Sequence, residues 1–282
     1  MGHLQGPGKL NELFEKNSMT TFLETAIEAA RLGGKILMES LSDLETKQVQ
    51  RKQEFDFVTQ IDHRSEEAIL KLIRERHPEH SILAEESGGS KEEQDYLWII
   101  DPLDGTKNYI HGFPVFAVSV ALQFKSELRV GVVFDPVRDE LFHAEKGKGA
   151  FLNGDPIKVS ETTDFSECLL ATGFPFRAKH LTEPYLEAFK ELFYQVSDFR
   201  RAGAAAIDLA YVACGRLDGF WELMLNSWDI AAGALLIEEA GGEVTDIWRG
   251  GSHLKTGHIV ASNGLIHEQI TTATSNKFKV LC

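Results

Sequence analysis

Cysteine is scarce in this sequence, and this limits what can stabilise the fold. The chain of 282 residues has three cysteines, Cys168, Cys214 and Cys282, which lie far apart and outside any C-x-x-C pair. An odd number of widely spaced cysteines argues against a disulfide framework and against a zinc site. Proteins with reduced cysteines are the rule in the cytoplasm, so we expect a cytoplasmic protein.

Long apolar runs and an excess of basic charge are also lacking. No apolar stretch reaches the roughly 18 residues of a membrane-spanning helix, and residues 1–18 lack the apolar core of a secretory signal. The 43 acidic residues outnumber the 29 basic ones, for a net charge of −14. This balance argues against binding to nucleic acid or to an anionic membrane. It does not exclude an anionic substrate, because bound cations can reverse the local field.

The sequence has no Pro-, Gly- or Ser-rich linker that would separate independent domains. Its content of 43% hydrophobic and 26% charged residues is typical of a globular protein with a large core. We expect one domain over residues 19–282, built from two packed halves at about 19–160 and 161–282. Residues 1–18 are expected to form a flexible extension.

Hydrophobic periodicity predicts a mixture of helices and strands. Helices are expected at residues 20–42 (loosened at Gly33-Gly34), 62–76, 183–194, 203–214, 228–240 and 264–273. Strands are expected at residues 81–84, 96–100, 115–124, 129–134, 140–145, 150–152, 168–172 and 217–223, with late strands at Val244 and 259–261. A loop is expected within 44–56, and the strands from 115 to 152 read as an antiparallel meander. Helices and strands in both halves indicate layered α/β packing.

An acidic turn follows the buried strand that ends at residue 100. Pro102 is expected to end this strand between Asp101 and Asp104, and Gly105 to turn the chain into a short helix. Carboxylates at the carboxyl end of a buried strand lie where α/β folds bind ligands. Two converging carboxylates repel each other, so a cation would stabilise them, with the Leu103 carbonyl as a further oxygen ligand. Oxygen ligands favour Mg²⁺, Mn²⁺ or Ca²⁺ over zinc. The alternative is an Asx-turn in which Asp104 caps a helix.

Three other acidic segments are each ambiguous when taken alone. Glu85 and Glu86 end a short strand, where ordinary surface carboxylates are common. Asp56 and Asp62 precede a predicted helix, and Asp62 can act as its N-cap. Asp229 opens an Ala- and Gly-rich helix, where a carboxylate interacts favourably with the helix dipole. A simple cap is an equally good interpretation of Asp229.

In combination, these segments resemble the inositol monophosphatase family. Residues 56–62 resemble its D-x-V-T-x-x-D pattern, and residues 85–87 its E-E-S. Residues 98–109 are similar to its W-I-x-D-P-[IL]-D-G-T-x-N-[FY] signature, and residues 228–242 to W-D-x-A-A-G…E-A-G-G. Order and spacing agree over roughly residues 20–275.

The resemblance implies a fold and an activity. The fold is a layered αβαβα sandwich of the sugar phosphatase type, with mixed and antiparallel sheets. The activity is that of a Mg²⁺-dependent, Li⁺-sensitive phosphomonoesterase acting on a small phosphorylated polyol or sugar, with myo-inositol 1-phosphate as first choice. A homodimer is also implied. The segments Gly173-Phe174-Pro175 and Arg200-Arg201-Ala202-Gly203 resemble the bacterial branch of the family.

The resemblance further implies two or three Mg²⁺ ions. Glu85, Asp101 and the Leu103 carbonyl would hold the first ion. Asp101, Asp104 and Asp229 would hold the second, and Glu85 would face a third, weaker ion through water. Paired metals neutralise phosphoryl oxygens and activate water for attack, so no covalent enzyme intermediate is needed.

Roles for other side chains follow from the same resemblance. Thr106 would hydrogen-bond the attacking water and Asp62 would accept from Thr106, so both join Glu85 as expected catalytic residues. Glu222 would accept hydrogen bonds from a polyol, while Arg200 would lie near the substrate or a dimer contact. A paired surface arginine is an equally plausible interpretation of Arg200. The full set expected to contact substrate is Asp104, Gly105, Thr106, Arg200, Gly203, Ala204, Ala205, Glu222 and Asp229, with backbone N–H groups of Gly105 and Thr106 cradling the phosphate.

Several alternatives stay open at this point. The family often places a lysine shortly before the D-x-V-T segment, and either Arg51 or Lys52 can take that place. Related phosphatases share the metal motifs: fructose 1,6-bisphosphatase, histidinol phosphatase and 3′-phosphoadenosine 5′-phosphate phosphatase. Some bacterial relatives act instead as transcription antitermination partners, a role that does not require the metal ligands.

Overall fold

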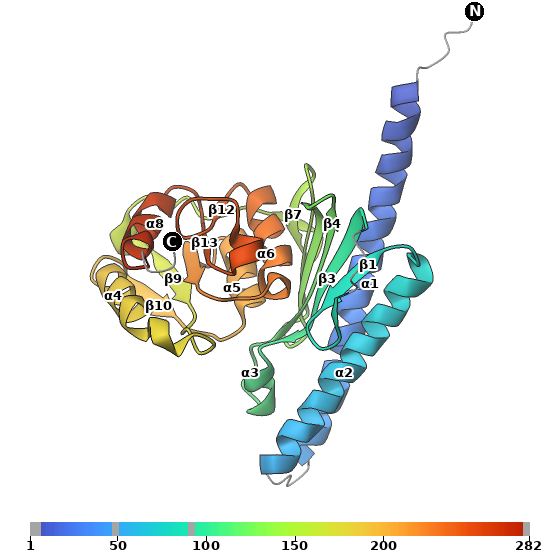
Figure 1. Cartoon of the computed structure of the whole chain (residues 1–282), viewed down its shortest axis with the longest axis horizontal. Helices are drawn as coiled ribbons and strands as arrows, with labels where there is room; N and C mark the ends of the chain where they lie inside the picture. Colours follow the sequence, from blue (N-terminus) through green and yellow to red (C-terminus); the bar gives the residue numbers. More distant parts are fainter. Residues whose placement is uncertain (1–6, 47–50, 90–93, 279–282) are drawn as a thin grey trace, which may run out of the picture.

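The molecule is a stack of alternating helical and sheet layers (Figure 1). The computed structural model describes the backbone of residues 7–46, 51–89 and 94–278, and the side chains of residues 22–41, 60–89 and 94–278. Three clusters of buried apolar residues fill the spaces between successive layers. The layered αβαβα architecture expected from the sequence is confirmed.

Two long helices form the first layer. Helices α1 (Pro7–Thr46) and α2 (Arg51–Arg76) pack against each other and against one face of the larger sheet. Gly33 and Gly34 do not loosen α1, contrary to expectation. A Cβ atom at Gly33 would lie 2.8 Å from Ile69 Cδ1, and one at Gly34 would lie 2.6 Å from the Phe134 ring. These glycines therefore allow the close approach of α1 to α2 and to the sheet.

Both helices start earlier than expected. The backbone of residues 7–18, expected to be a flexible extension, continues α1, and this end of the helix projects beyond the sheets in Figure 1. Helix α2 starts well before residue 62, so Asp62 lies inside the helix and is not its N-cap. Polar composition concealed both helix starts because it gives no apolar periodicity. Part of the loop expected within 44–56, and the side chains of Arg51, Lys52 and Asp56, lie outside the described residues.

The larger sheet forms the second layer, with strand order β2-β1-β3-β4-β5-β6-β7-β8. Its strands are β1 (Ser81–Ala84), β2 (Gly88–Gly89), β3 (Tyr96–Asp104), β4 (Ala117–Phe124), β5 (Glu127–Asp135), β6 (Glu140–Glu145), β7 (Gly149–Leu152) and β8 (Asp155–Ile157). Strands β1 and β3 are parallel, and every pair from β3 to β8 is antiparallel. The expected meander is therefore confirmed, while the short strands β2 and β8 were not predicted.

Helices α5 (Ala205–Ala213) and α6 (Ser227–Glu239) lie between the two sheets. Their sequences are almost entirely apolar because both sides of each helix are buried. Gly131 of β5 lets α6 approach closely, since a Cβ atom there would lie 2.8 Å from the Ala232 carbonyl oxygen. Gly241 follows α6 with a φ angle of 89°, which confirms the expected glycine cap.

The smaller sheet and two outer helices complete the stack. The sheet has the order β10-β9-β11-β13-β12 and is covered on its outer face by a third apolar cluster. Its strands are β9 (Leu169–Thr172), β10 (Asp198–Arg200), β11 (Gly219–Glu222), β12 (Glu243–Thr245) and β13 (Ile259–Ser262). The outer helices are α4 (Thr182–Phe193) and α8 (His267–Ser275), and short helical turns are η1 (Phe165–Glu167), η2 (Lys179–Leu181) and α7 (His253–Thr256). Strand β10 and helix α7 are too short for sequence periodicity to reveal.

Two observations bear on the environment of the chain. In the part of the chain that the structure describes, no helix combines the length and apolar character needed to cross a bilayer. Cys168 is buried and Cys214 is half-buried, and both carry free thiols.

Candidate active site

The acidic segment after β3 adopts an irregular strand end. Asp101 pairs with Ser119 and Asp104 with Ala117, and the pairing shifts between these two positions. Pro102 lies in this interruption, as expected for a residue without an N–H to donate. Pro102 therefore disturbs the strand without ending it, which corrects the expectation from the sequence. The Asp101 carboxylate accepts a hydrogen bond from the Leu103 N–H at 2.9 Å.

Gly105 makes the turn from this strand end into the short helix α3 (Thr106–Ile110). Its φ angle is 90°, and a Cβ atom would lie 2.9 Å from the Val115 carbonyl oxygen. The expected short helix is present, but its N-cap is Gly105 and not Asp104. The Asp104 carboxylate instead accepts a hydrogen bond from the Ala206 N–H of α5 at 2.7 Å. The helix-cap interpretation of Asp104 is therefore wrong.

Asp229 lies in the first turn of α6. Its Oδ2 atom accepts a hydrogen bond from the Asn226 N–H at 2.7 Å, as part of a reciprocal capping box. The Ser119 hydroxyl of β4 donates to the Trp228 carbonyl at 3.1 Å and ties this helix start to the larger sheet. The N-cap of α6 is Asn226, so Asp229 supports the cap from the third helical position and is not the simple cap that the sequence offered as an alternative.

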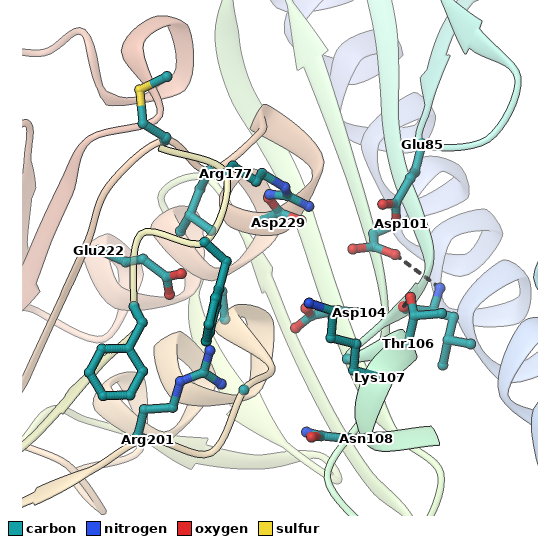
Figure 2. Close-up of a pocket in the computed structure, with 18 of the residues that line it drawn as sticks. Glu85, Asp101, Asp104, Thr106, Lys107, Asn108, Arg177, Arg201, Glu222 and Asp229 are labelled. Carbon is teal, nitrogen blue, oxygen red and sulfur yellow. Dashed lines mark hydrogen bonds and ion pairs between the residues drawn. The ribbon is translucent and has the colours of Figure 1, made fainter. Parts of the chain in front are cut away.

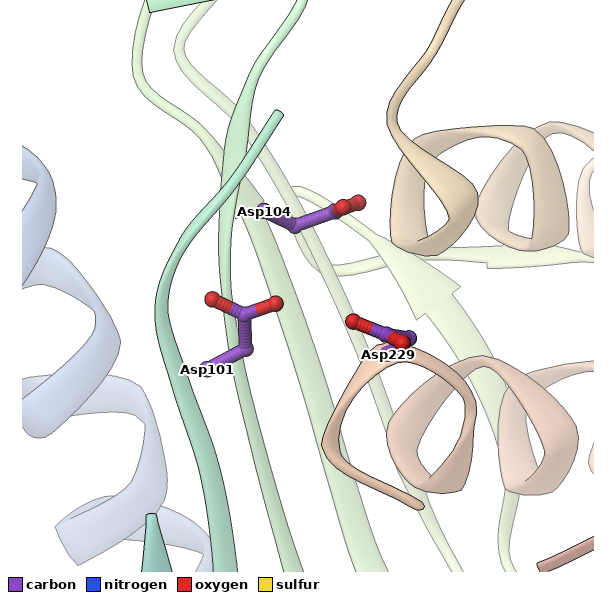
Figure 3. Close-up of side chains that lie close together, drawn as sticks. All are labelled: Asp101, Asp104 and Asp229. Carbon is purple, nitrogen blue, oxygen red and sulfur yellow. The ribbon is translucent and has the colours of Figure 1, made fainter. Parts of the chain in front are cut away.

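Three carboxylates from the two halves of the chain converge. Asp101, Asp104 and Asp229 are buried, and one oxygen atom from each lies within 4.8 Å of the others (Figure 3). Hard divalent cations such as Mg²⁺ and Ca²⁺ are bound by such oxygen sets. The structure thus brings these three residues together from distant positions in the sequence.

Glu85 extends this cluster from the end of β1. Its N–H donates to the Ile100 carbonyl at 3.2 Å, which continues the pairing with β3. Glu66 of α2 accepts hydrogen bonds from the N–H groups of Glu86 and Ser87, both at 2.9 Å, and so fixes the turn after Glu85. The Glu85 side chain points toward Asp101 (Figure 2).

The electrostatics of this cluster call for a cation. Burial raises the pKa of Asp101 and of Asp104 well above the usual value, and neighbouring carboxylates raise both further. Burial likewise raises the pKa of Glu85 and of Asp229. Buried negative charges of one sign are unfavourable without a counter-charge. The cluster Glu85, Asp101, Asp104 and Asp229 therefore fits a divalent metal ion.

Asp62 and Thr106, the two residues of the expected relay, both lie beside this cluster. Burial, followed by the charges of nearby glutamates, raises the pKa of Asp62 to about 8. Its buried Oδ1 atom has no hydrogen-bond partner among the described residues. The Thr106 hydroxyl donates to the Leu103 carbonyl at 3.1 Å. A hydrogen bond from the Thr106 hydroxyl to the Asp62 carboxylate stays a prediction.

A cavity of about 260 Å³ opens above the carboxylates, between the two halves (Figure 2). The residues expected at the site that line it are Glu85, Asp101, Leu103, Asp104, Gly105, Thr106, Gly203, Ala205, Glu222 and Asp229. Ala204 is buried at the start of α5, and Asp62 is buried in α2; neither is part of the lining. Arg200 also does not line the cavity, because its side chain pairs with Asp198 at 2.6 Å on the surface. The paired-arginine interpretation of Arg200 is thus the correct one.

Comparison with known proteins shows the family to which the chain belongs. A model of the "Inositol monophosphatase family" matches residues 18–278. The chain belongs to the inositol monophosphatase family. Membership supports a phosphatase, and the family fold matches the layers described above.

Individual members of the family align over almost the full chain. The Nus factor SuhB of Pseudomonas aeruginosa is 48% identical over 250 residues, covering 87% of this chain and 92% of that protein. The structure of inositol monophosphatase from Anabaena (Nostoc) is 43% identical, with a TM-score of 0.83, covering 92% of this chain and 97% of that one. A structure of SaIMPase-II with bound inositol monophosphate is 25% identical, with a TM-score of 0.78, covering 93% and 96%.

Sequence reasoning missed part of the cavity wall of this family member. The additional lining residues are Lys107, Asn108, Phe174, Phe176, Arg177, Arg201, Leu223, Met224 and Leu225. Asn108 joins the two halves, because its amide donates to the carbonyls of Val115 at 2.7 Å and Ala202 at 2.9 Å. For Phe174, Phe176, Arg177 and Arg201, the signal was their position in or next to the segments Gly173-Phe174-Pro175 and Arg200-Arg201.

Glu222 lies across the cavity from Asp101 and Asp104 (Figure 2). Burial raises its pKa to about 8, while the positive charges of Arg201 and Arg177 oppose this rise. Gly173 packs directly against the Glu222 carboxylate, with no room for a Cβ atom between them. A half-buried carboxylate with little direct pairing is suited to bind hydroxyl groups of a ligand.

Proposed function

We propose that this protein is a cytoplasmic, Mg²⁺-dependent phosphomonoesterase that hydrolyses myo-inositol 1-phosphate. One observation carries the proposal: three buried carboxylates, Asp101, Asp104 and Asp229, meet at the base of an open cavity between the two halves, with the half-buried Glu85 beside them. Membership of the inositol monophosphatase family supports the same reaction class.

The acidic residues would divide between two or three ions. Glu85, Asp101 and the Leu103 carbonyl would hold one ion, and Asp101, Asp104 and Asp229 a second, with Glu85 facing a third through water. Mg²⁺ bound there would neutralise the phosphoryl oxygens, activate water and stabilise the leaving oxygen. The donor set fits Mg²⁺ because all of these ligand atoms are oxygens.

The chain's own residues would position water and phosphate. Thr106 lines the cavity, and its hydroxyl can turn from the Leu103 carbonyl to the attacking water. Asp62 would accept the hydrogen bond of Thr106 through Oδ1, which has no partner among the described residues. Gly105 and Thr106 would supply backbone N–H groups to the phosphate.

The opposite wall would select the alcohol part of the substrate. Glu222 would accept hydrogen bonds from ring hydroxyls, and the small residues Gly203 and Ala205 leave room for the ring. An inositol monophosphatase from Anabaena and an inositol monophosphate complex of SaIMPase-II share this fold. A polyol phosphate is therefore the first choice of substrate.

A substrate panel tests this proposal against its closest alternatives. Purified protein with Mg²⁺ would be assayed for phosphate release from myo-inositol 1-phosphate, fructose 1,6-bisphosphate, histidinol phosphate and 3′-phosphoadenosine 5′-phosphate. We expect the highest kcat/KM for myo-inositol 1-phosphate. A higher value for another ester would reassign the substrate, and release from none of them would contradict a phosphatase.

A second role, in transcription antitermination, is favoured by one observation. The relative that is 48% identical is named Nus factor SuhB. Such a role would use the protein surface and would not require the metal ligands. The Asp104→Asn protein should therefore capture transcription factors in a pull-down as well as the wild type does. If neither the wild type nor Asp104→Asn captures transcription factors, this second role is contradicted.

We also propose a homodimer, on the basis of family membership alone. Sedimentation velocity of the full chain tests it, with a mass of about twice the 31.5 kDa chain expected. A single species at the mass of one chain would contradict it.

A further inference from the structure

Arg177 pairs with a proposed metal ligand across the mouth of the cavity. It lies between β9 and η2, and its Nη1 atom donates to Asp229 Oδ2 at 3.1 Å. The Arg177 side chain is 53% exposed, whereas that of Asp229 is 6% exposed. Within the described residues, Asp229 is the sole acidic side chain at ion-pair distance from Arg177. The guanidinium therefore occupies the solvent side of the metal centre.

The charge of Arg177 acts on several carboxylates of the cavity. Burial raises the pKa of Glu85, Asp229 and Glu222, and the positive charge of Arg177 opposes that rise at all three. Lys107 and Arg201, the other cations of the cavity wall, form no ion pair with a described carboxylate. Arg177 is therefore the cation placed to balance the acidic cluster in the absence of metal.

The backbone around Arg177 is held from both halves of the molecule. The Lys107 Nζ atom of α3 lies 5.1 Å from the centre of the Phe176 ring, and Arg201 Cζ lies 5.4 Å from the same ring. Gly173, at the start of the segment, packs against Glu222. An anchored backbone and an exposed, flexible arginine stem allow the guanidinium to move without rearrangement of the loop.

Metal and phosphate would act on this guanidinium in opposite directions. A divalent cation between Asp101, Asp104 and Asp229 repels Arg177 and competes with it for the negative charge of Asp229. A phosphate dianion in the same cavity attracts it, because arginine binds phosphate through two parallel N–H groups. Asp229 stays oriented throughout, since Oδ2 also accepts the Asn226 N–H.

We propose that Arg177 is a built-in counter-ion of Asp229 that metal binding displaces and that then binds the phosphoryl group of the substrate. This inference rests on the proposed metal-dependent phosphatase function and adds a residue that neither the family motifs nor the metal cluster includes. Arg177 thereby weakens metal binding to the free protein and strengthens phosphate binding to the metal-loaded protein.

Calorimetric titrations of the full chain with Mg²⁺ and with inorganic phosphate separate these effects. Arg177→Gln should bind Mg²⁺ roughly two- to fivefold more tightly than wild type, the range expected for loss of a half-exposed ion pair. In saturating Mg²⁺, the same variant should bind inorganic phosphate about tenfold more weakly. Arg177→Lys, which keeps the charge, should match wild type in Mg²⁺ affinity. Arg200→Gln is the matched control, because Arg200 is also 53% exposed in an ion pair but does not line the cavity; its Mg²⁺ affinity should be unchanged.

Each remaining result has a clear meaning. If Arg177→Gln binds Mg²⁺ as tightly as wild type or more weakly, the counter-ion role is contradicted. If its affinity for inorganic phosphate is unchanged, the phosphate-binding role is contradicted. If wild-type protein binds Mg²⁺ and the variant matches it in both titrations, the inference alone fails. If wild-type protein binds no Mg²⁺, the proposed function fails together with the inference.

Discussion

The side chain of Asp104 and the backbone of Ala206 join the two halves of the molecule beside the carboxylate cluster. The Asp104 Oδ2 atom accepts the Ala206 N–H at 2.7 Å, across 102 positions of sequence. The same carboxylate therefore faces the cavity and fixes the start of α5. Substitution of Asp104 by asparagine removes the negative charge but keeps the hydrogen bond, because the amide oxygen of asparagine can still accept the Ala206 N–H.

Asp104→Asn should abolish turnover while leaving the fold intact. Loss of one metal-ligating charge should lower kcat by about a hundredfold or more. The metal-free variant should be at least as stable as wild type, since a buried charge is removed and the bond to Ala206 is kept. Phosphate release and thermal unfolding measure the two effects.

Asp104→Ala is the matched control for the hydrogen bond. It loses the acceptor for the Ala206 N–H as well as the charge, so its unfolding midpoint should be lower than that of Asp104→Asn. Near-normal activity of Asp104→Asn would show that the metal assignment is wrong.

The stability of the metal-free protein should fall as pH rises, partly through Asp62. Burial raises the pKa of Asp62 from 3.8 to about 8. Between these values the folded protein keeps a proton that the unfolded chain has released, so the free energy of unfolding decreases with pH. The contribution of Asp62 is complete below about pH 4 and is lost as pH passes about 8. Urea unfolding in a chelator at pH 5 and pH 8 measures it.

Asp62→Asn tests the assignment of this pH dependence. The variant cannot ionise at this position, so it should lose less stability between pH 5 and pH 8 than wild type. Equal losses in the two proteins would mean that Asp62 does not titrate in this range. Added Mg²⁺ should restore stability most at pH 8, because metal ligands bind in their ionised form.

Gly173→Ala should disturb the alcohol side of the cavity. An added Cβ atom would overlap the Glu222 carboxylate, so Glu222 must shift away from a bound polyol. We expect KM for the polyol phosphate to rise roughly tenfold, with a smaller change in kcat, because the metal centre is untouched.

Gly251→Ala is the control for this substitution, since a Cβ atom at Gly251 meets no atom within 4 Å. Its kinetics should match wild type. A Gly173→Ala enzyme with unchanged KM would argue against Glu222 as a substrate contact.

Li⁺ should inhibit phosphate release, as family membership leads us to expect for a second metal position formed with Asp229. A Li⁺ titration at fixed Mg²⁺ measures the inhibition. Full activity throughout the titration would count against the second metal position.

The sequence predicted the converging carboxylates because each lies in a local motif that marks a strand end or a helix start. Asp101 and Asp104 follow a continuously apolar strand, and Asp229 begins an Ala-rich helix. The layer order was predictable for the same reason, since alternating helix and strand periods constrain how elements pack.

Long-range packing was not predictable from local pattern. Gly33 suggested a weakened helix, because the approach of Ile69 that it permits is invisible in one sequence. Arg177 follows the segment Gly173-Phe174-Pro175, which the sequence marked only as similar to the bacterial branch of the family. Nothing in the local sequence shows that Arg177 reaches Asp229, 52 positions away. Arg200 and Arg201 are adjacent and chemically alike, so only the fold determines which of them lines the cavity.

The central claim is that the converging carboxylates form a Mg²⁺-dependent phosphatase centre. The most direct measurement is phosphate release from myo-inositol 1-phosphate by the purified chain, in Mg²⁺ and in a chelator, with Asp104→Asn alongside. We predict release by wild type in Mg²⁺, and none by wild type in the chelator or by Asp104→Asn in Mg²⁺. Equal release with and without Mg²⁺, or none from wild type in Mg²⁺, would contradict the claim.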